Sequence, residues 1–313
     1  MTATGIALIN RVGWLVATAS CLMGGLGLAS VQAQSSPVET AMRHVDFHVD
    51  STLVMHIEYL RGRLIERHPG QPPWFDDPHS FDIEMDTASI TLSTTALADL
   101  LNRYVFNYRG SPLRAVRVQV DHGRLEQSGR LHGLPFSIIT DATVTPGGEL
   151  RLHPTTIHAF GIGVQGLMHL FGLSLQKLAD VGKAPGVRIA GNDLLLTPAT
   201  MLPPPTTRGK LVAVALHDSA LTLMFGGHGP VRPLVAPDAR AVSYMYYRGG
   251  TIRFWTLTMT PADLLIVDHD PRDPFDFWLA RYRAQLVAGT SRNTATGGLI
   301  TEWPDYNKVR SKK

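Results

Sequence analysis

Three side chains with the chemistry of metal ligands lie close together near the start of the chain. His44, Asp46 and His48 alternate with apolar residues, so on an extended strand all three point to one face. Two imidazoles and a carboxylate can bind zinc, but a zinc site needs further ligands that converge on the same point. His56 lies too far along the strand, and the sequence identifies no other partner. We therefore interpret these side chains as the solvated face of an amphipathic strand.

A second group of titratable residues, between positions 268 and 276, offers oxygen ligands for calcium. Its members are Asp268, His269, Asp270, Asp273 and Asp276. An EF-hand loop requires glycine at its sixth position and a terminal glutamate, and both are absent. The sequence instead predicts a helix that begins here, with Asp273 as N-cap, Pro274 at the first position and Asp276 completing a capping box. Capping then explains Asp273 and Asp276 without a metal.

Patterns associated with nucleophilic catalysis are incomplete. Ser174 and Lys177 have the spacing of the nucleophile motif of penicillin-binding enzymes, but the Lys-Thr-Gly triplet of that family is absent. The glycine cluster 226–229 lacks the serine of a nucleophile elbow and the lysine of a phosphate loop. The thirteen histidines are scattered, whereas general acid–base catalysis needs converging groups. We predict no catalytic residue, no metal and no cofactor; a metal-assisted hydrolase using His44, His48 and the acidic loop remains an alternative.

The histidines belong to a long alternating segment that runs from position 44 to position 59. Its odd positions carry the apolar residues Val45, Phe47, Val49, Leu53, Met55, Ile57 and Tyr59. Two-residue alternation predicts a β-strand with one dry and one wet face. At roughly 3.4 Å per residue a single strand of this length spans on the order of 50 Å. The segment therefore predicts a wide, curved antiparallel sheet.

Two apolar helical stripes are expected to pack against this sheet. Ser93 is the predicted N-cap of the first helix, in which leucines, Tyr104 and Val105 recur on one face. The second helix, near residue 168, is apolar nearly all round, as in a core or lipid-facing helix. If a cavity lies beside these helices, its predicted lining residues are Leu97, Leu101, Tyr104, Val164, Leu167, Met168 and Phe171.

Further strands and turns account for most of the remaining chain. Strands are predicted at 81–92, 116–120, 125–131, 136–144, 150–157, 187–189, 194–197, 211–216 and 221–225. Hairpin turns at 121–123 and 146–148 are expected to join the strands on either side of them. After a proline-rich segment at 230–240, the sequence predicts a meander of strands at 243–248, 252–259 and 264–268. The helix that begins near Asp273 then ends at Gly289. We expect a first domain at 34–228 and a C-terminal meander and helix at 229–313, packed on the same sheet.

The first 33 residues resemble a secretory signal peptide. Arg11 precedes an uncharged run that ends in Val31-Gln32-Ala33, and small residues at these positions are typical of a signal-peptidase site after Ala33. Two alternatives remain: a retained membrane anchor, since about 20 uncharged residues can span a bilayer, and lipidation at Cys21. We expect a mature chain beginning near Gln34, without cysteine or disulfide, in the periplasm or cell envelope.

Composition excludes one class of partner. The chain has 313 residues and a formal net charge of +3, so it is long enough to bury a large core. Basic and acidic residues are interspersed throughout, without the basic patch of a nucleic-acid-binding protein. We expect no nucleic-acid partner.

The middle of the chain, about residues 85 to 225, resembles a known family. The segments that carry the resemblance are 96–102, 111–118, 123–125, 129–131, 148–154, 171–173 and 192–196. Their pattern of strands, turns and one helix is similar to the LmeA-like family of exported bacterial lipid-binding proteins. The strand from His44 and the segment after Pro230 have no counterpart in that pattern.

The resemblance implies a TULIP-type α+β fold, in which a long, curved antiparallel sheet wraps one or two apolar helices and leaves a cavity for acyl chains. The expected function is that of an exported envelope protein that binds a lipid or another long apolar ligand without covalent chemistry. The membrane surface or an envelope protein would be a further contact. The alternative from a different class is a structural or protein-interaction module of the cell envelope.

Overall fold

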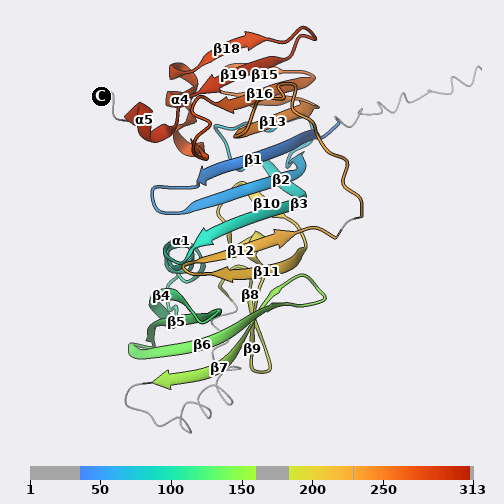
Figure 1. Cartoon of the computed structure of the whole chain (residues 1–313). Helices are drawn as coiled ribbons and strands as arrows, with labels where there is room; N and C mark the ends of the chain where they lie inside the picture. Colours follow the sequence, from blue (N-terminus) through green and yellow to red (C-terminus); the bar gives the residue numbers. More distant parts are fainter. Residues whose placement is uncertain (1–35, 160–182, 228, 311–313) are drawn as a thin grey trace, which may run out of the picture. The chain divides into compact units, whose positions relative to one another are not determined.

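β-strands dominate the fold. The computed structural model describes residues 36–159, 183–227 and 229–310, and these belong to one compact unit. The strands form an 11-stranded sheet, a six-stranded sheet and a two-stranded hairpin, and the helices are short (Figure 1). Most strand pairs are antiparallel. The predicted antiparallel, sheet-rich class is therefore confirmed.

The large sheet combines strands from both ends of the described chain. Its strands are β1 (Val38–His48), β2 (Val54–Glu66), β3 (Phe81–Ser93), β10 (Thr206–Arg208), β11 (Leu211–His217), β12 (Ala220–Phe225), β13 (Tyr244–Gly249), β16 (Ala262–Asp268), β17 (Phe275–Trp278), β18 (Thr290–Asn293) and β19 (Leu299–Trp303). The order is β11-β12-β3-β2-β1-β13-β16-β19-β18, with β10 paired to β3 and β17 paired to β1. The C-terminal strands thus extend the sheet that β1 to β3 begin.

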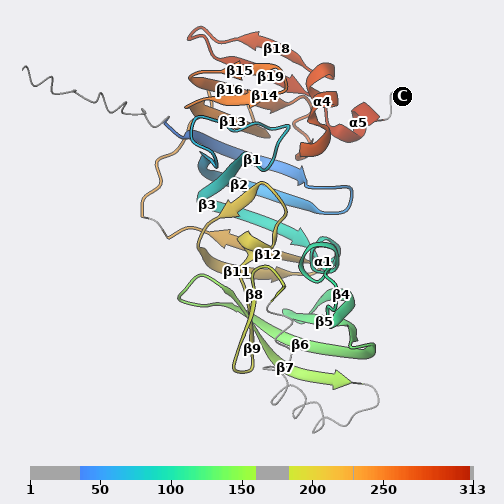
Figure 2. The same ribbon diagram turned by 180° about the vertical axis from the view of Figure 1, so that it is seen from behind.

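The second sheet comes from the middle of the chain. Its strands are β4 (Leu113–Asp121), β5 (Arg124–Leu131), β6 (Leu134–Val144), β7 (Leu150–Ala159), β8 (Val187–Ala190) and β9 (Asp193–Leu196). Neighbours in the order β4-β5-β6-β7-β9-β8 pair antiparallel. The view from behind brings the β8–β9 hairpin to the front (Figure 2). The predicted turns at 121–123 and 146–148 are confirmed: they join β4 to β5 and β6 to β7.

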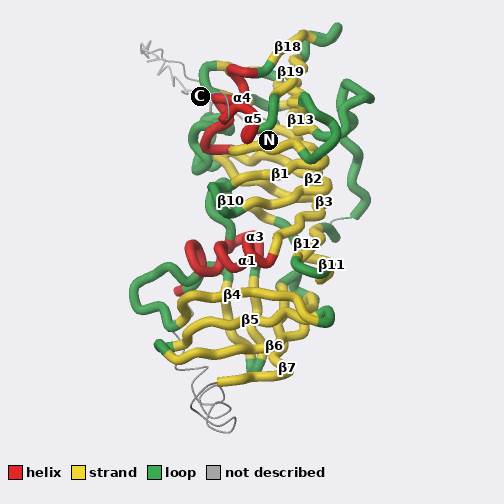
Figure 3. Tube along the Cα trace, turned by 60° about the vertical axis from the view of Figure 1, so that its left-hand side comes forward, coloured by secondary structure: helices red, strands yellow, loops and turns green. Residues whose placement is uncertain are grey.

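Short helices connect and cover the sheets. They are α1 (Thr94–Leu100), the π-helical turn η1 (Leu101–Val105) that continues it, α3 (Pro198–Met201), the 3₁₀ turn η3 (Leu279–Arg281), α4 (Tyr282–Ala288) and α5 (Tyr306–Arg310). Figure 3 shows α1 and α3 between strands of the large sheet and β4. None of the described helices has the length and apolar character needed to cross a membrane.

The alternating segment 44–59 is not the single long strand that its pattern predicts. β1 ends at His48, β2 begins at Val54, and the two strands pair antiparallel with Phe47 opposite Met55. Odd-numbered residues pair with odd-numbered residues across this hairpin. The alternation therefore continues in phase through the turn, and the sequence pattern cannot distinguish one strand from two.

The inward face of β2 changes phase at Tyr59. The pairing of β2 with β3 shifts register between Ile57 and Tyr59, and a β-bulge of this kind moves the following side chains to the other face. Tyr59 is accordingly 42% exposed, while Leu60 and Leu64 are buried. The prediction that Tyr59 shares the dry face was wrong.

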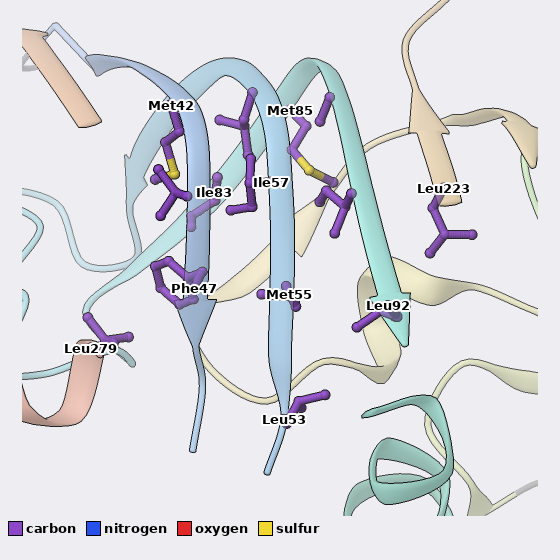
Figure 4. Close-up of a cluster of buried hydrophobic side chains, with 14 of the residues drawn as sticks. Met42, Phe47, Leu53, Met55, Ile57, Ile83, Met85, Leu92, Leu223 and Leu279 are labelled. Atoms are coloured by element: carbon purple, nitrogen blue, oxygen red, sulfur yellow. The ribbon is translucent and has the colours of Figure 1, made fainter. Parts of the chain in front are cut away.

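The apolar face of β1 to β3 forms a large part of the core. Met42 and Phe47 of β1, Ile57 of β2 and Met85 of β3 are all buried on it (Figure 4). Full burial of one such side chain stabilises the fold by roughly 1.5–3 kcal/mol. The sequence has a single cysteine and so forms no internal disulfide, which makes this packing a main source of stability.

Gly62 lies where β2 and β3 approach closely. A Cβ atom at this position would lie 2.2 Å from the backbone oxygen of Glu84. Gly62→Ala is therefore expected to lower the free energy of unfolding by about 1–3 kcal/mol, because the strands must separate locally. Urea unfolding measures this loss. Gly147→Ala is the matched control, since a Cβ there meets no atom closer than 3.6 Å; equal losses for both variants would contradict the steric explanation.

The predicted C-terminal meander is wrong in its middle strand. β13 pairs directly with β16, and the residues between them form the separate hairpin β14 (Ile252–Phe254) and β15 (Leu257–Met259). The outer strands of the predicted meander thus become direct neighbours in the large sheet.

The helix predicted from Asp273 is also wrong at its start. Residues 275–278 form β17, which pairs parallel with β1, and α4 begins only at Tyr282. Phe275 and Phe277 are fully buried, and this burial outweighs a capping signal worth about 1 kcal/mol. The end of the helix at Gly289 is confirmed. Asp273 and Asp276 therefore do not cap this helix.

One edge of β1 is divided between two partners. Residues 39–43 pair antiparallel with β13, and residues 45–48 pair parallel with β17. His44 lies between these two stretches in the left-handed region, with φ 48°, which histidine adopts more often than most residues. The middle of the large sheet thus depends on segments from both ends of the chain.

Candidate functional site

An apolar cavity of about 150 Å³ lies between the six-stranded sheet and the α1–η1 segment. The strands of the sheet contribute most of its wall, including Val116 and Val118 of β4, Leu125 of β5, Ile138 of β6 and Leu152 of β7. These residues alternate along their strands and so share one face of the sheet. The sequence alternation marked this face, but did not indicate which element covers it.

α1 is held in place at both ends. Ser93 Oγ accepts a hydrogen bond from Ala96 N at 3.1 Å, which confirms the predicted N-cap. At the other end, Asn102 Nδ2 donates to Ala98 O and to Val116 O, and Val116 N donates back to Asn102 Oδ1 at 2.8 Å. Asn102 thus joins η1 to β4, a positioning role that no pattern in the sequence indicated.

Only some of the predicted lining residues meet at this cavity. Leu97 and Leu101, four positions apart on one helical face, both line it. Tyr104 is not among the lining residues, because its side chain reaches the turn between β1 and β2 instead. The other predicted members, Val164, Leu167, Met168 and Phe171, lie outside the described residues, as does the predicted signal peptide.

The neutral polar side chains deep in the wall have partners within the protein. Gln127 Nε2 donates to Thr140 Oγ1 at 2.9 Å, and Thr140 Oγ1 donates to Leu125 O at 3.3 Å. Burying a polar group without a hydrogen bond is costly, and these two avoid that cost without a ligand. The deep wall therefore favours an apolar occupant.

One charged residue, Asp193, also borders the cavity. Its carboxylate accepts hydrogen bonds from Arg151 Nε at 2.5 Å and His153 Nδ1 at 2.6 Å. These bonds, that from Arg151 first, lower the pKa of Asp193 below its ordinary value. Asp193 is therefore an ionised, paired group beside an otherwise apolar space.

A second cavity, of about 30 Å³, adjoins the first. The two share Leu97, Leu150 and Leu196 as wall residues. Met55 and Met85 form part of the far wall of the smaller cavity, and methionine side chains adapt readily to a change in their surroundings. The interior on this side of α1 is therefore loosely packed over two neighbouring spaces.

The Tyr104 hydroxyl donates a hydrogen bond to Asp50 Oδ2, which lies in the turn between β1 and β2. Thr52 N and Leu53 N donate to Asp50 Oδ1 at 2.8 and 2.9 Å. Burial disfavours the ionised form of Asp50, but these hydrogen bonds and Arg103 outweigh it and lower its pKa to about 2. Burial and the contact with Asp50 raise the pKa of Tyr104 to about 12. Asp50 thus anchors the η1 segment to the first hairpin.

Asp50→Asn is expected to weaken the fold in a pH-dependent way. Because the folded-state pKa lies below the ordinary value of 3.8, the stabilising contribution is present above about pH 4 and is lost as pH falls through about 2. The free energy of unfolding of the variant should be lower than that of the parent by about 2 kcal/mol at neutral pH and by less in strong acid. Urea unfolding across this range measures the difference. Asp121→Asn, at the exposed end of β4, is the control. A stability difference between Asp50→Asn and the parent that stays constant at all pH values would contradict the assignment.

The histidines considered for zinc lie apart. His44 Nε2 lies 2.9 Å from Glu58 Oε1, His48 contacts Asp276, and Asp46 binds His56. Four residues along a strand separate His44 from His48 by about 13 Å, too far for one ion. In the part of the chain that the structure describes, the group spaced to share an ion is a different one: Asp268, Asp273 and Asp305.

Comparisons of the chain with family models, curated proteins and solved structures give no match.

Proposed function

We propose that this protein binds the hydrocarbon chain of a lipid, or another long apolar ligand, in the cavity beneath α1, and performs no covalent chemistry on it. The observation that supports this most is the chemistry of the wall. Valine, leucine, isoleucine and phenylalanine side chains dominate it, and its deep polar groups are already paired. Such a space gains free energy from burying an apolar ligand, and most of its wall offers no hydrogen bond to a polar one.

The size of the cavity indicates how much of a ligand enters. An engineered apolar cavity of roughly 150 Å³ accepts a benzene molecule, whereas pockets for whole drug-sized ligands have volumes of about 300–1,000 Å³. The present cavity, about 150 Å³, therefore suits the end of one chain. The adjoining space across Leu97 provides room for a longer segment if that side chain changes rotamer.

We also propose the TULIP-type arrangement and the relationship to the LmeA-like family. Long antiparallel strands, a helix packed across one sheet and an apolar space beneath that helix support both. Export to the periplasm or cell envelope, with the membrane surface or an envelope protein as a further contact, is part of the same proposal. It rests on the N-terminal sequence and on the resemblance.

Binding of a series of straight-chain fatty acids tests the proposal. The full chain, purified from its own envelope fraction, is examined by native mass spectrometry for copurified lipid. After delipidation it is titrated with fatty acids of increasing length in competition with a fluorescent acyl probe. Affinity should rise by up to about fourfold per methylene until the cavity is filled, as expected for about 0.8 kcal/mol per buried CH₂.

A protein that carries no lipid and takes up no member of the series is not a lipid-binding protein. A structural or interaction module of the envelope would then be the better account. Affinity that does not depend on chain length would show that the ligand is held by its head group and not by this cavity.

A further inference from the structure

The C-terminal segment contains an acidic cluster that the proposed apolar site does not use. Asp268 at the end of β16, Asp273 before β17 and Asp305 before α5 each place a carboxylate oxygen within 4.8 Å of the other two. Asp268 and Asp305 are buried, with exposed fractions of 4% and 1%, and Asp273 is exposed. The cluster therefore has two buried members and one open to solvent.

One atom in this cluster lacks a partner. Asp268 Oδ1 accepts a hydrogen bond from Asp270 N at 2.9 Å, but Asp268 Oδ2 is buried and accepts none from the described residues. Burial, opposed by the bond from Asp270 and assisted by the carboxylates of Asp305 and Asp273, raises the pKa of Asp268 to about 7. A buried carboxylate oxygen beside two further carboxylates is an incomplete environment that a cation would complete.

The basic side chain at this place neutralises only part of the cluster. Lys308 Nζ donates to Asp305 Oδ2 at 2.7 Å and to Asp270 Oδ2 at 2.9 Å. Arg272 pairs with Asp270. Neither of them hydrogen-bonds Asp268 Oδ2. Among the described residues, no lysine or arginine side chain therefore forms an ion pair with Asp268 or Asp273.

We propose that Asp268, Asp273 and Asp305 bind a calcium ion that joins the end of β16 to the segments before β17 and α5. The ligand set contains oxygen alone, which selects a hard cation over zinc. Oxygens that lie within 4.8 Å of one another can reach one ion. Calcium is favoured over magnesium, because calcium binds carboxylate oxygens in irregular arrangements at roughly 2.4 Å, whereas magnesium requires near-ideal octahedral geometry and keeps most of its water. Water can reach the ion beside the exposed Asp273 and complete its coordination. This proposal is independent of the apolar site.

Calcium titration of the full chain, stripped with a chelator and held at about pH 8 so that carboxylates are ionised, tests the site. We expect saturable 1:1 binding by calorimetry, and a rise in Tm of roughly 2–5 °C at about ten times Kd. Calcium should bind more tightly than magnesium. No saturable binding up to about 10 mM, well above the weak range of roughly 10⁻⁴–10⁻³ M, would overturn the proposal, and equal affinity for magnesium would overturn the assignment to calcium.

Four variants locate the ion. Asp268→Asn and Asp273→Asn should each weaken calcium binding at least about tenfold. Because Asp273 is exposed, the second variant is expected to fold as the parent does. Lys308→Gln should strengthen binding severalfold, because it removes a positive charge next to the ion. Asp218→Asn, the same change in the exposed turn between β11 and β12, should bind as the parent does. Parent-like binding by Asp273→Asn, or weaker binding by Lys308→Gln, would contradict the assigned position.

Discussion

Replacing Trp303 by alanine is expected to lower the free energy of unfolding by about 3–5 kcal/mol. The side chain is 1% exposed, and its ring lies 6.2 Å from each of the Phe277 and Tyr282 rings and 6.4 Å from that of Phe254. Its Nε1–H donates to Thr301 Oγ1 at 2.6 Å. Alanine would leave a large cavity where β17, β19 and α4 meet.

Urea unfolding followed by circular dichroism measures this loss. Trp303→Phe should lower the free energy of unfolding by less than Trp303→Ala does. Phenylalanine retains a ring, so only the indole hydrogen bond and part of the side-chain volume are lost. Trp255→Ala is the matched control: Trp255 is 41% exposed and the Arg283 guanidinium lies over its ring, a contact worth about 0.5–1 kcal/mol at an exposed site. Similar losses at positions 303 and 255 would mean that the aromatic cluster does not stabilise the fold as described.

Ile138→Trp is expected to weaken binding of an acyl probe at least about tenfold while changing stability little. Ile138 lies in the middle of β6 and faces the cavity, so the larger ring would occupy the space proposed for the ligand. In a close-packed interior the same enlargement would cost about 1–3 kcal/mol. Probe titration and urea unfolding of one preparation measure both quantities together.

Ile139→Trp is the matched control. It is the same change in the neighbouring residue of the same strand, on the face of the sheet that does not line the cavity. Its probe affinity should match the parent. Ile138→Trp could instead lower the free energy of unfolding by several kcal/mol and bind the probe with the affinity of the parent. That result would mean that the space beneath α1 is packed core and that the ligand site lies elsewhere.

Local signals in the sequence predicted local structure well. Ser93 caps α1, Leu97 and Leu101 share the face that borders the cavity, and the turn at 121–123 joins two paired strands. Each of these features depends on residues a few positions apart. Short-range geometry alone decides them, so the sequence pattern is sufficient.

The features that were predicted wrongly or not at all depend on contacts between residues far apart in the sequence. The residues after Asp273 carry strong helix-start signals, yet Phe275 and Phe277 belong to a strand that pairs with β1. No local pattern reveals this pairing. The cavity wall likewise combines residues from six strands of one sheet and from the helix that covers it. Alternation identified the apolar face of each strand, but the order of strands in the sheet sets which faces meet, and that order is not local information.

The divided edge of β1 cannot be paired until the C-terminal part of the chain has been synthesised. β1 is among the first described segments to be made, yet residues 39–43 and 45–48 find their partners in β13 and β17, near the other end of the chain. Until those strands are available, this edge presents unpaired backbone groups beside buried-type side chains, the state in which β-proteins aggregate most readily. A fragment that ends before residue 244 keeps that edge permanently open. We therefore expect the N-terminal part of the chain to be prone to aggregation until its C-terminal strands, or a chaperone in their place, cover this edge.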